Sequence, residues 1–176
     1  FPITLFAQTR VYTVEVDNSR PKEPQIDQLS LAVDLSFEPN IGKVQGEVEI
    51  VFVPKVGGLD SIWFDGPGIK IITAKIAEKE VLFKTNDKGT AIYPKPAFSY
   101  KDTVTLAFTY EAFPKRGMFF VGWDDKTNTA PKQIWTQGQG IDNRYWVPHV
   151  DDQNDKLITS ISATVDADYA VISNGK

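Results

Sequence analysis

Hydrophobic and polar residues alternate with a period of two along most of the chain. The alternation is clearest in four segments, at residues 29–37, 44–52, 104–110 and 157–165. Successive side chains of a β-strand point to opposite faces, so each segment predicts a strand with one buried and one solvent-facing side. The side chains predicted to face inward are Leu29, Leu31, Val33, Leu35 and Phe37; Val44, Gly46, Val48, Ile50 and Phe52; Val104, Leu106, Phe108 and Tyr110; and Leu157, Thr159, Ile161, Ala163 and Val165.

Turn-forming sequences separate these segments. EPNIGK at residues 38–43 predicts a hairpin between the first two strands, and GPG at 66–68 and NDKG at 86–89 mark further turns. A short meander is predicted at 69–76, 80–84 and 91–94. The only helical feature expected is a single turn within 151–156. We therefore expect an all-β fold, either a β-sandwich or strongly curved, mostly antiparallel sheets.

The N-terminus has the pattern of a targeting segment. Residues 1–6 are apolar, and LFA at 5–7 matches the small-residue site at which signal peptides are cleaved. The alternative is an apolar edge strand at the start of the fold. Because polar, proline-rich NSRPKEP follows at 18–24, we interpret residues 1–24 as a signal-peptide remnant and leader. This interpretation predicts a secreted or periplasmic protein.

The C-terminal residues predict that the protein continues. The apolar run at 169–172 is followed directly by SNGK, and Asn-Gly after a strand is typical of a hairpin turn. No returning strand follows in the sequence. We therefore expect residues 25–176 to form one domain cut from a longer protein, and a chain of this length is sufficient to bury a hydrophobic core.

Composition and charge argue against several classes of function. The net charge of −4 and the isoelectric point of about 5.0 disfavour a nucleic-acid-binding protein, which needs a basic surface. The sequence has no cysteine and a single histidine, His149, so it predicts no disulfide, no cysteine nucleophile and no zinc site of the usual kind. No stretch approaches the roughly 20 apolar residues of a membrane-spanning helix.

The segment QIWTQGQGIDNRYWVP, at residues 133–148, is the strongest candidate for a functional site. It combines aromatic residues, glycines and glutamines, but has no residue typical of a nucleophile. A Gly-x-Gly sequence lets another backbone approach closely, and glutamine amides both donate and accept hydrogen bonds. Gln137 and Gln139 are therefore candidates for binding a peptide-like ligand. The alternative is that they are polar residues of a strand edge that face water.

Three aromatic residues of this segment, Trp135, Tyr145 and Trp146, also have two interpretations. An exposed row of such rings would form a platform for sugars or peptides. Large aromatic residues more often anchor a core or an interface, and this is the interpretation that we adopt. Some of the three rings would then pack against a further domain.

A group of acidic residues follows at Asp151, Asp152 and Asp155. These residues lack the ligand spacing and the central glycine of an EF-hand calcium loop, so a solvated turn is expected instead. His149 alone does not make a metal site, because zinc sites use several histidine or cysteine ligands. The sequence therefore gives no candidate catalytic residue and no candidate metal ligand set in this chain.

Beyond these patterns, PKQIWTQGQGIDNRYWVPHVDDQNDK at residues 131–156, followed by VISNGK, resembles one particular family. It is similar to the N-terminal domain of the zinc aminopeptidases that include aminopeptidase N and leukotriene hydrolase, which are gluzincin metallopeptidases. DQLSLAVDLSFEPNIGKVQGEVEIVF at 27–52 looks like the opening hairpin of that domain. FPKRGMFFVG at 113–122 looks like the short element before its Thr-Gln signature. The resemblance spans residues 25–176.

The resemblance implies a saddle-shaped β-sandwich that covers one side of a thermolysin-like catalytic domain. That domain would lie downstream and carry an HExxH zinc motif with a distal glutamate ligand, which activates water for hydrolysis of the bond after the N-terminal residue. None of those groups is present in this sequence. By itself the chain is therefore expected neither to bind the catalytic zinc nor to hydrolyse peptides.

The resemblance also implies roles for particular residues. In the Thr136-Gln137-x-Gln139 signature, Gln137 would line the first specificity pocket. Gln139 would contact the free α-amine of the substrate or a nearby carbonyl group. Dedicated aminopeptidases commonly have glutamate where Gln139 stands, and the leukotriene hydrolase type has glutamine. Family positions also imply an ion pair between Arg144 and Asp151.

Two further residues differ from the pattern of the family. His149 stands where many members have cysteine, and Gln153 replaces a common proline. We interpret both differences as structural variation.

Two other functions remain open at this point. One is a stand-alone β-sandwich module that binds carbohydrate or peptide, and the other is a scaffold domain in a protein without catalysis.

Overall fold

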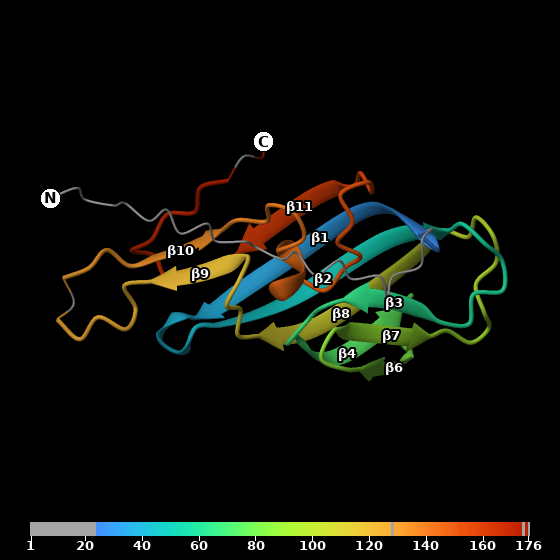
Figure 1. Cartoon of the computed structure of the whole chain (residues 1–176), viewed down its shortest axis with the longest axis horizontal. Coiled ribbons are helices and arrows are strands. Elements are labelled where there is room, and N and C mark those ends of the chain that lie inside the picture. The colour runs from blue at the N-terminus through green and yellow to red at the C-terminus, as the bar shows by residue number, and fades with distance from the viewer. Residues whose placement is uncertain (1–23, 128, 174, 176) are drawn as a thin grey trace, which may run out of the picture.

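In the part of the chain that the structure describes, the alternating sequence folds into three β-sheets, so the expected all-β class and its mostly antiparallel sheets are confirmed (Figure 1). The computed structural model describes residues 24–127, 129–173 and 175. The predicted leader at 1–24 therefore lies outside the described residues, except for Pro24. The strands are β1 (Ile26–Glu38), β2 (Lys43–Pro54), β3 (Ile62–Asp65), β4 (Lys70–Ile76), β5 (Lys79–Glu80), β6 (Leu82–Thr85), β7 (Gly89–Tyr93), β8 (Val104–Ala112), β9 (Met118–Val121), β10 (Gln133–Thr136) and β11 (Ile158–Ala163).

The largest sheet has six strands in the order β11-β1-β2-β8-β4-β5. β1 and β2 form the predicted hairpin, and its turn contains the short 3-10 helix η1 (Pro39–Ile41). Gly42 closes this turn with φ of 65°, a left-handed conformation that glycine adopts without strain. Among the strands of the described residues, the only parallel pair joins β1 to β11, so the chain returns to the edge of the sheet after passing through the other strands.

A smaller sheet, in the order β3-β7-β6, packs over part of the large one (Figure 1). Phe64 of β3 contacts Phe52 and Phe108 of the large sheet in edge-to-face geometry, with ring centroids 6.0 Å and 5.4 Å apart. Phe98 joins the same cluster at 5.8 Å from Phe52. Such contacts add to the free energy gained by burying the rings, so this cluster fixes the two layers against each other.

The inward faces predicted for 44–52 and 104–110 are confirmed, and the face predicted for 29–37 is wrong at one residue. Leu29 is 42% exposed, because a β-bulge between Gln28 and Ser30 shifts the pairing of β1 with β2. A bulge inserts one unpaired residue and so reverses the alternation on one side of it. Ile26 and Gln28 therefore face the core before the bulge, and the alternating inward residues resume at Leu31.

The prediction for 157–165 is right in its strand, but only part of the predicted inward face is buried. Leu157 packs against the core and Ala163 is partly buried, whereas Thr159, Ile161 and Val165 are exposed. Ile161 lies opposite the buried Val33, yet 52% of its surface is exposed. β11 is at the edge of the large sheet, whereas the second layer lies over β8 and β4 (Figure 1). The alternation in this segment thus marks a strand whose inward side is only partly covered by the described residues.

The predicted meander is divided between two sheets. β4 and β5 belong to the large sheet, while β6 and β7 pair in the small one. The apolar segment at 80–84 is split at Val81, whose backbone N–H donates to the Ala74 carbonyl at 2.9 Å. The helical turn allowed at 151–156 is not a helix. Within the described residues the second 3-10 helix is η2 (Asn143–Tyr145).

Candidate functional site

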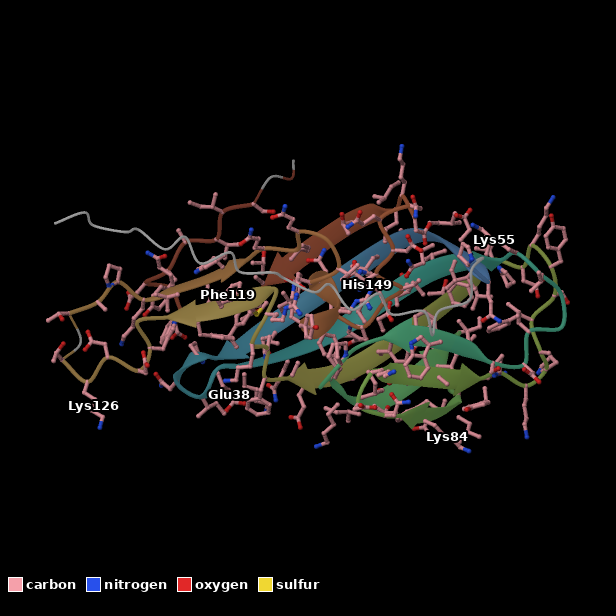
Figure 2. The ribbon with its side chains drawn as sticks, in the orientation of Figure 1. Glu38, Lys55, Lys84, Phe119, Lys126 and His149 are labelled. Carbon is pink, nitrogen blue, oxygen red and sulfur yellow. The ribbon has the colours of Figure 1, made fainter. Side chains whose placement is uncertain are left out.

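The candidate segment at residues 133–148, called the signature segment below, begins with β10. The chain remains extended for at least one residue after β10 ends. β10 pairs with β9 in a two-stranded ribbon (Figure 1). Trp135 of β10 lies opposite Phe119 of β9, which is labelled in Figure 2. The ladder extends further, because the backbone N–H of Gln137 donates to the Gly117 carbonyl at 2.8 Å. Side chains alternate along an extended strand, so Gln137 points to the same side of the ribbon as Trp135.

Gln137 and Gln139 lie together, and both are exposed. The Nε2 atom of Gln137 donates to Oε1 of Gln139 at 3.5 Å, which is the long limit of a hydrogen bond and contributes little energy. Each amide therefore retains most of its capacity to donate and to accept. The structure brings the two predicted residues together and leaves their polar groups open to water or to a ligand.

Two glycines allow the following loop to pack closely behind this pair. Gly117 has φ of +74°, and a Cβ atom there would overlap the carbonyl oxygen of Asp142. At Gly138 a Cβ atom would overlap the side-chain amide of Asn143. The sequence predicted a close backbone approach at the Gly-x-Gly sequence, but the closest neighbour of Gly138 is a side chain. A close approach of another backbone occurs instead at Gly117, on the neighbouring-strand side of the ribbon. Both contacts restrict where Gln137 and its neighbours can lie.

A buried ion network anchors the loop that follows the signature. The predicted ion pair is confirmed, since Arg144 Nε lies 3.7 Å from Asp151 Oδ2 and the Arg144 backbone N–H donates to the same oxygen at 3.0 Å. Arg144 Nη2 also lies 3.5 Å from Oδ2 of Asp65, at the end of β3. Nothing in the sequence pattern singles out Asp65, which is 86 residues away from Asp151. The network ties the signature loop to the second layer of the sandwich.

His149 belongs to the same network, which agrees with its interpretation as a structural residue. Its ring is buried, with Nδ1 3.0 Å from the Val147 carbonyl and Nε2 3.5 Å from Asp151 Oδ1. A carbonyl oxygen only accepts, so Nδ1 carries a proton and donates in this contact. The backbone of His149 also exchanges two hydrogen bonds with Asp65, at 2.9 and 3.2 Å. The imidazole thus contributes to the packing and the hydrogen bonds of the network.

The solvated turn expected for the acidic group is wrong for Asp151, which is only 7% exposed. Burial by itself raises the pKa of this carboxyl group. The hydrogen bond and charge of His149, together with the N–H and charge of Arg144, outweigh burial and hold the pKa of Asp151 below its ordinary value. Asp152 does have the role of a turn residue, because its side chain accepts the Asn154 backbone N–H at 2.9 Å.

We expect the lowered pKa of Asp151 to make the fold sensitive to acid. A group whose pKa is lower in the folded state stabilises the fold above its unfolded pKa, which for this group is 3.8, and this stabilisation is lost as the pH falls through the folded pKa. The urea midpoint of the unmodified chain should therefore fall between pH 6 and pH 3 by more than that of Asp151→Asn. Equal decreases in the two proteins would contradict this assignment.

Gln28, a residue that the sequence pattern did not identify, fixes the loop from the opposite side. It is fully buried at the bulge of β1. Its side chain bonds both backbone groups of Val150, with Nε2 2.7 Å from the carbonyl and Oε1 3.0 Å from the N–H. Nε2 also donates to Asp155 Oδ2 at 2.9 Å. A glutamine among the core-facing residues of an apolar strand would have indicated such a role. The bulge shifts the alternation at this point, so the sequence pattern did not place Gln28 on the core side.

The three aromatic residues of the segment have different environments. Trp146 is 5% exposed and belongs to the core, as expected for an anchor. Tyr145 is partly buried and contacts Arg116, whose guanidinium lies 5.0 Å from the ring centroid and donates to the hydroxyl at 3.2 Å. Trp135 is 43% exposed and stacks on Phe119, with ring centroids 4.4 Å apart. The rings therefore do not form one exposed row.

The described residues do not fit a zinc site. Among them, no group of three or more histidine, cysteine, aspartate or glutamate side chains has the arrangement of a metal site. The acidic groups around His149, Asp65 and Asp151, instead both pair with Arg144. No helix in the described part of the chain is long and apolar enough to cross a membrane.

Comparison with solved structures shows where else this fold occurs. A mutant of the M1 zinc metallopeptidase from Deinococcus radiodurans, bound to a Tyr-Ser-Ala substrate, superposes with a TM-score of 0.65 at 14% identity, over 79% of this chain and 32% of the other. A mutant of a two-domain M1 zinc metallopeptidase, bound to L-arginine, gives 0.67 at 16% identity, over 82% and 33%. At this identity the likeness shows the shared fold. This chain spans about one third of the length of those proteins.

Sequence comparison identifies the family. A search of curated proteins found no match. The family model for the Peptidase M1 N-terminal domain matches residues 23–176, which include every strand that the structure describes and the whole segment at 133–148. We conclude that this chain belongs to the Peptidase M1 N-terminal domain family.

Proposed function

We propose that this chain is the substrate-recognition and packing domain of a zinc-dependent aminopeptidase, which removes N-terminal residues from peptides. The observation that carries this proposal is the exposed Gln137–Gln139 amide pair, in the signature segment of a chain of the M1 N-terminal family. Solved proteins of the same fold were bound to Tyr-Ser-Ala, L-arginine and L-tryptophan, which supports a peptide terminus as the ligand.

In this proposal the two amides have separate roles. The side-chain oxygen of Gln139 accepts a hydrogen bond from the α-ammonium group of the peptide, or its N–H donates to a nearby carbonyl. Gln137 lines the pocket that receives the first side chain. An amide carries no net charge, so its bond to an ammonium group is weaker than the bond that a carboxylate would form. Binding would thus depend on several contacts of moderate strength.

Hydrolysis itself would take place outside this chain. Zinc, supplied by a downstream catalytic domain, would provide the Lewis acid for attack on the peptide bond. No step of that reaction is assigned to the residues described here, which bind and orient the peptide. The partner of this domain would be that catalytic domain. A secreted or periplasmic location is part of the proposal and is supported by the sequence of residues 1–24.

The proposal is tested with the full-length protein that contains this chain. Its activity on L-aminoacyl anilides is measured with and without a zinc chelator, beside the isolated 176-residue chain. We expect chelator-sensitive release of the aniline by the full-length protein only. A full-length protein with no such activity would contradict the proposal and favour a scaffold domain or a stand-alone binding module.

Substitution of Gln139 tests its contact with the amine. Gln139→Glu should lower KM for substrates with a free α-amine about five-fold, because a charged pair strengthens the bond by about 1 kcal/mol. Gln139→Ala should raise KM by a similar factor, because the bond is lost. Steady-state kinetics measure both effects. Gln133→Glu, which adds the same charge further back on the ribbon, is the matched control, and an equal effect there would argue against a specific contact.

A further inference from the structure

Trp135 shares one side of the β9–β10 ribbon with the amide pair. It lies two residues before Gln137, and the Gln137 bond to Gly117 shows that the strand remains extended between them. Alternate residues of a strand point the same way with their Cα atoms about 7 Å apart. Trp135 and Gln137 therefore point to the same side of the ribbon. Gln139 lies in the bend that follows, and its side chain joins the row through its 3.5 Å contact with Gln137.

The indole ring is fixed in an exposed position. Phe119, directly across the ribbon, stacks on it with centroids 4.4 Å apart and planes inclined by 23° (Figure 2 labels Phe119). The other side of the ribbon faces the body of the domain, where Phe120 packs edge-on against Phe37 with centroids 6.4 Å apart. Trp135 nevertheless keeps 43% of its surface exposed. Stacking on Phe119 limits the conformational entropy that the ring would lose on contact with a ligand.

Gln137 lies across the ribbon from Gly117, whose carbonyl accepts its backbone N–H. The backbone of Asp142 occupies the position that a side chain at residue 117 would take, so the neighbours of Gln137 that remain exposed lie along its own strand. Gln137 lies between Gln139, whose side chain it contacts, and Trp135, which stacks on Phe119. An aromatic wall next to a few polar groups is the usual composition of a site that binds a small amphipathic ligand.

We propose that Trp135 is a specificity-determining residue of this site, and that it receives an aromatic or long aliphatic side chain of the peptide's N-terminal residue. This inference rests on the function proposed above. With the α-amine at Gln139, the first side chain begins beside Gln137 and extends along the row. The side chain of phenylalanine or leucine reaches toward the indole, whereas the methyl group of alanine does not.

A contact between Trp135 and the downstream domain is the competing explanation for its exposure. The two explanations predict different kinetics. A residue of a domain interface affects every substrate to the same extent, whereas a wall of the first pocket changes the preference among N-terminal residues. The continuity of Trp135 with the exposed amide row favours the substrate. The ratio of kcat/KM for two substrates is therefore the quantity to measure.

The experiment uses the full-length protein with Trp135→Ala and Trp135→Phe, and the anilides of L-phenylalanine and L-alanine. We expect Trp135→Ala to lower the Phe/Ala ratio of kcat/KM about five-fold, in the range of an aromatic contact, and Trp135→Phe to retain most of it. Val121→Ala is the matched control, because Val121 is also 43% exposed and lies on the same side of the ribbon, opposite Gln133. This control should leave the ratio unchanged.

Each other outcome overturns a defined part of the proposal. An equal loss for both substrates in Trp135→Ala would assign the ring to a domain interface and refute its role in specificity. An unchanged ratio with unchanged activity would refute it as well. An unmodified protein that hydrolyses neither substrate would instead refute the proposed aminopeptidase function, and the role of Trp135 would fall with it.

Discussion

Replacing Arg144 with methionine is expected to lower the free energy of unfolding by about 3–5 kcal/mol. Arg144 is 8% exposed and lies between the carboxylates of Asp151 and Asp65, at 3.7 and 3.5 Å. Methionine fills a similar volume but leaves both carboxylates buried without their cation. Removing one partner of a buried ion pair is costly for this reason, even where the intact pair contributes little net stability.

Arg116→Met is the matched control for this prediction. Arg116 also pairs with an aspartate, Asp142, at 2.8 Å, but its side chain is 60% exposed. Exposed ion pairs contribute about 0–1 kcal/mol, so this variant should change the free energy of unfolding by no more than that. Urea denaturation followed by tryptophan fluorescence measures both. Similar values for the two variants would contradict the structural role assigned to the buried network.

Gln28→Met is expected to destabilise the chain by about 3 kcal/mol. Gln28 is the partner of both backbone groups of Val150 and also donates to Asp155. Methionine has a similar shape, but it would leave a buried N–H and a buried carbonyl without hydrogen bonds, at a cost of about 1–3 kcal/mol for each group. The effect is therefore much larger than that of an ordinary surface substitution.

Hydrogen exchange locates the effect of this substitution. In Gln28→Met the amide of Val150 should exchange much faster, because its acceptor is lost, while amides in the middle of β2 and β8 should follow only the global change in stability. Gln133→Met, at an exposed position of β10, is the control and should stay within about 0.5 kcal/mol of the unmodified protein. Unchanged protection at Val150 would show that Gln28 does not support the loop.

The strands could be predicted from the sequence because their alternation directly reflects which face is buried. The inward residues of β2 and β8 follow the period of two without interruption. The pattern failed where tertiary structure overrides it. A bulge at Gln28 moved Leu29 outward, and the edge position of β11 left Ile161 half exposed. Neither a bulge nor the order of strands in a sheet has a clear signature in one sequence.

In the candidate site too, contacts between residues close in the sequence could be predicted, and contacts with residues far away in the chain could not. The proximity of Gln137 and Gln139 follows from their spacing, and the pair of Arg144 with Asp151 was implied by the resemblance. Asp65 and Gln28 could not be predicted, because they reach the loop from strands that are 86 and more than 100 residues away in the chain. Asp65 and Gln28 hold the loop in position. The sequence alone therefore predicts the exposed residues of the site, but not the buried residues that position them.

The most direct test of the proposed role is a crystal structure of the full-length protein with a bound peptide analogue that has phenylalanine at its N-terminus and resists hydrolysis. We predict that Gln139 Oε1 lies about 2.7–3.2 Å from the α-amino nitrogen, and that the phenylalanine ring lies beside Gln137 and against Trp135. A peptide bound at another surface, with both glutamines in contact only with water, would contradict the assignment of this segment as the substrate-recognition site.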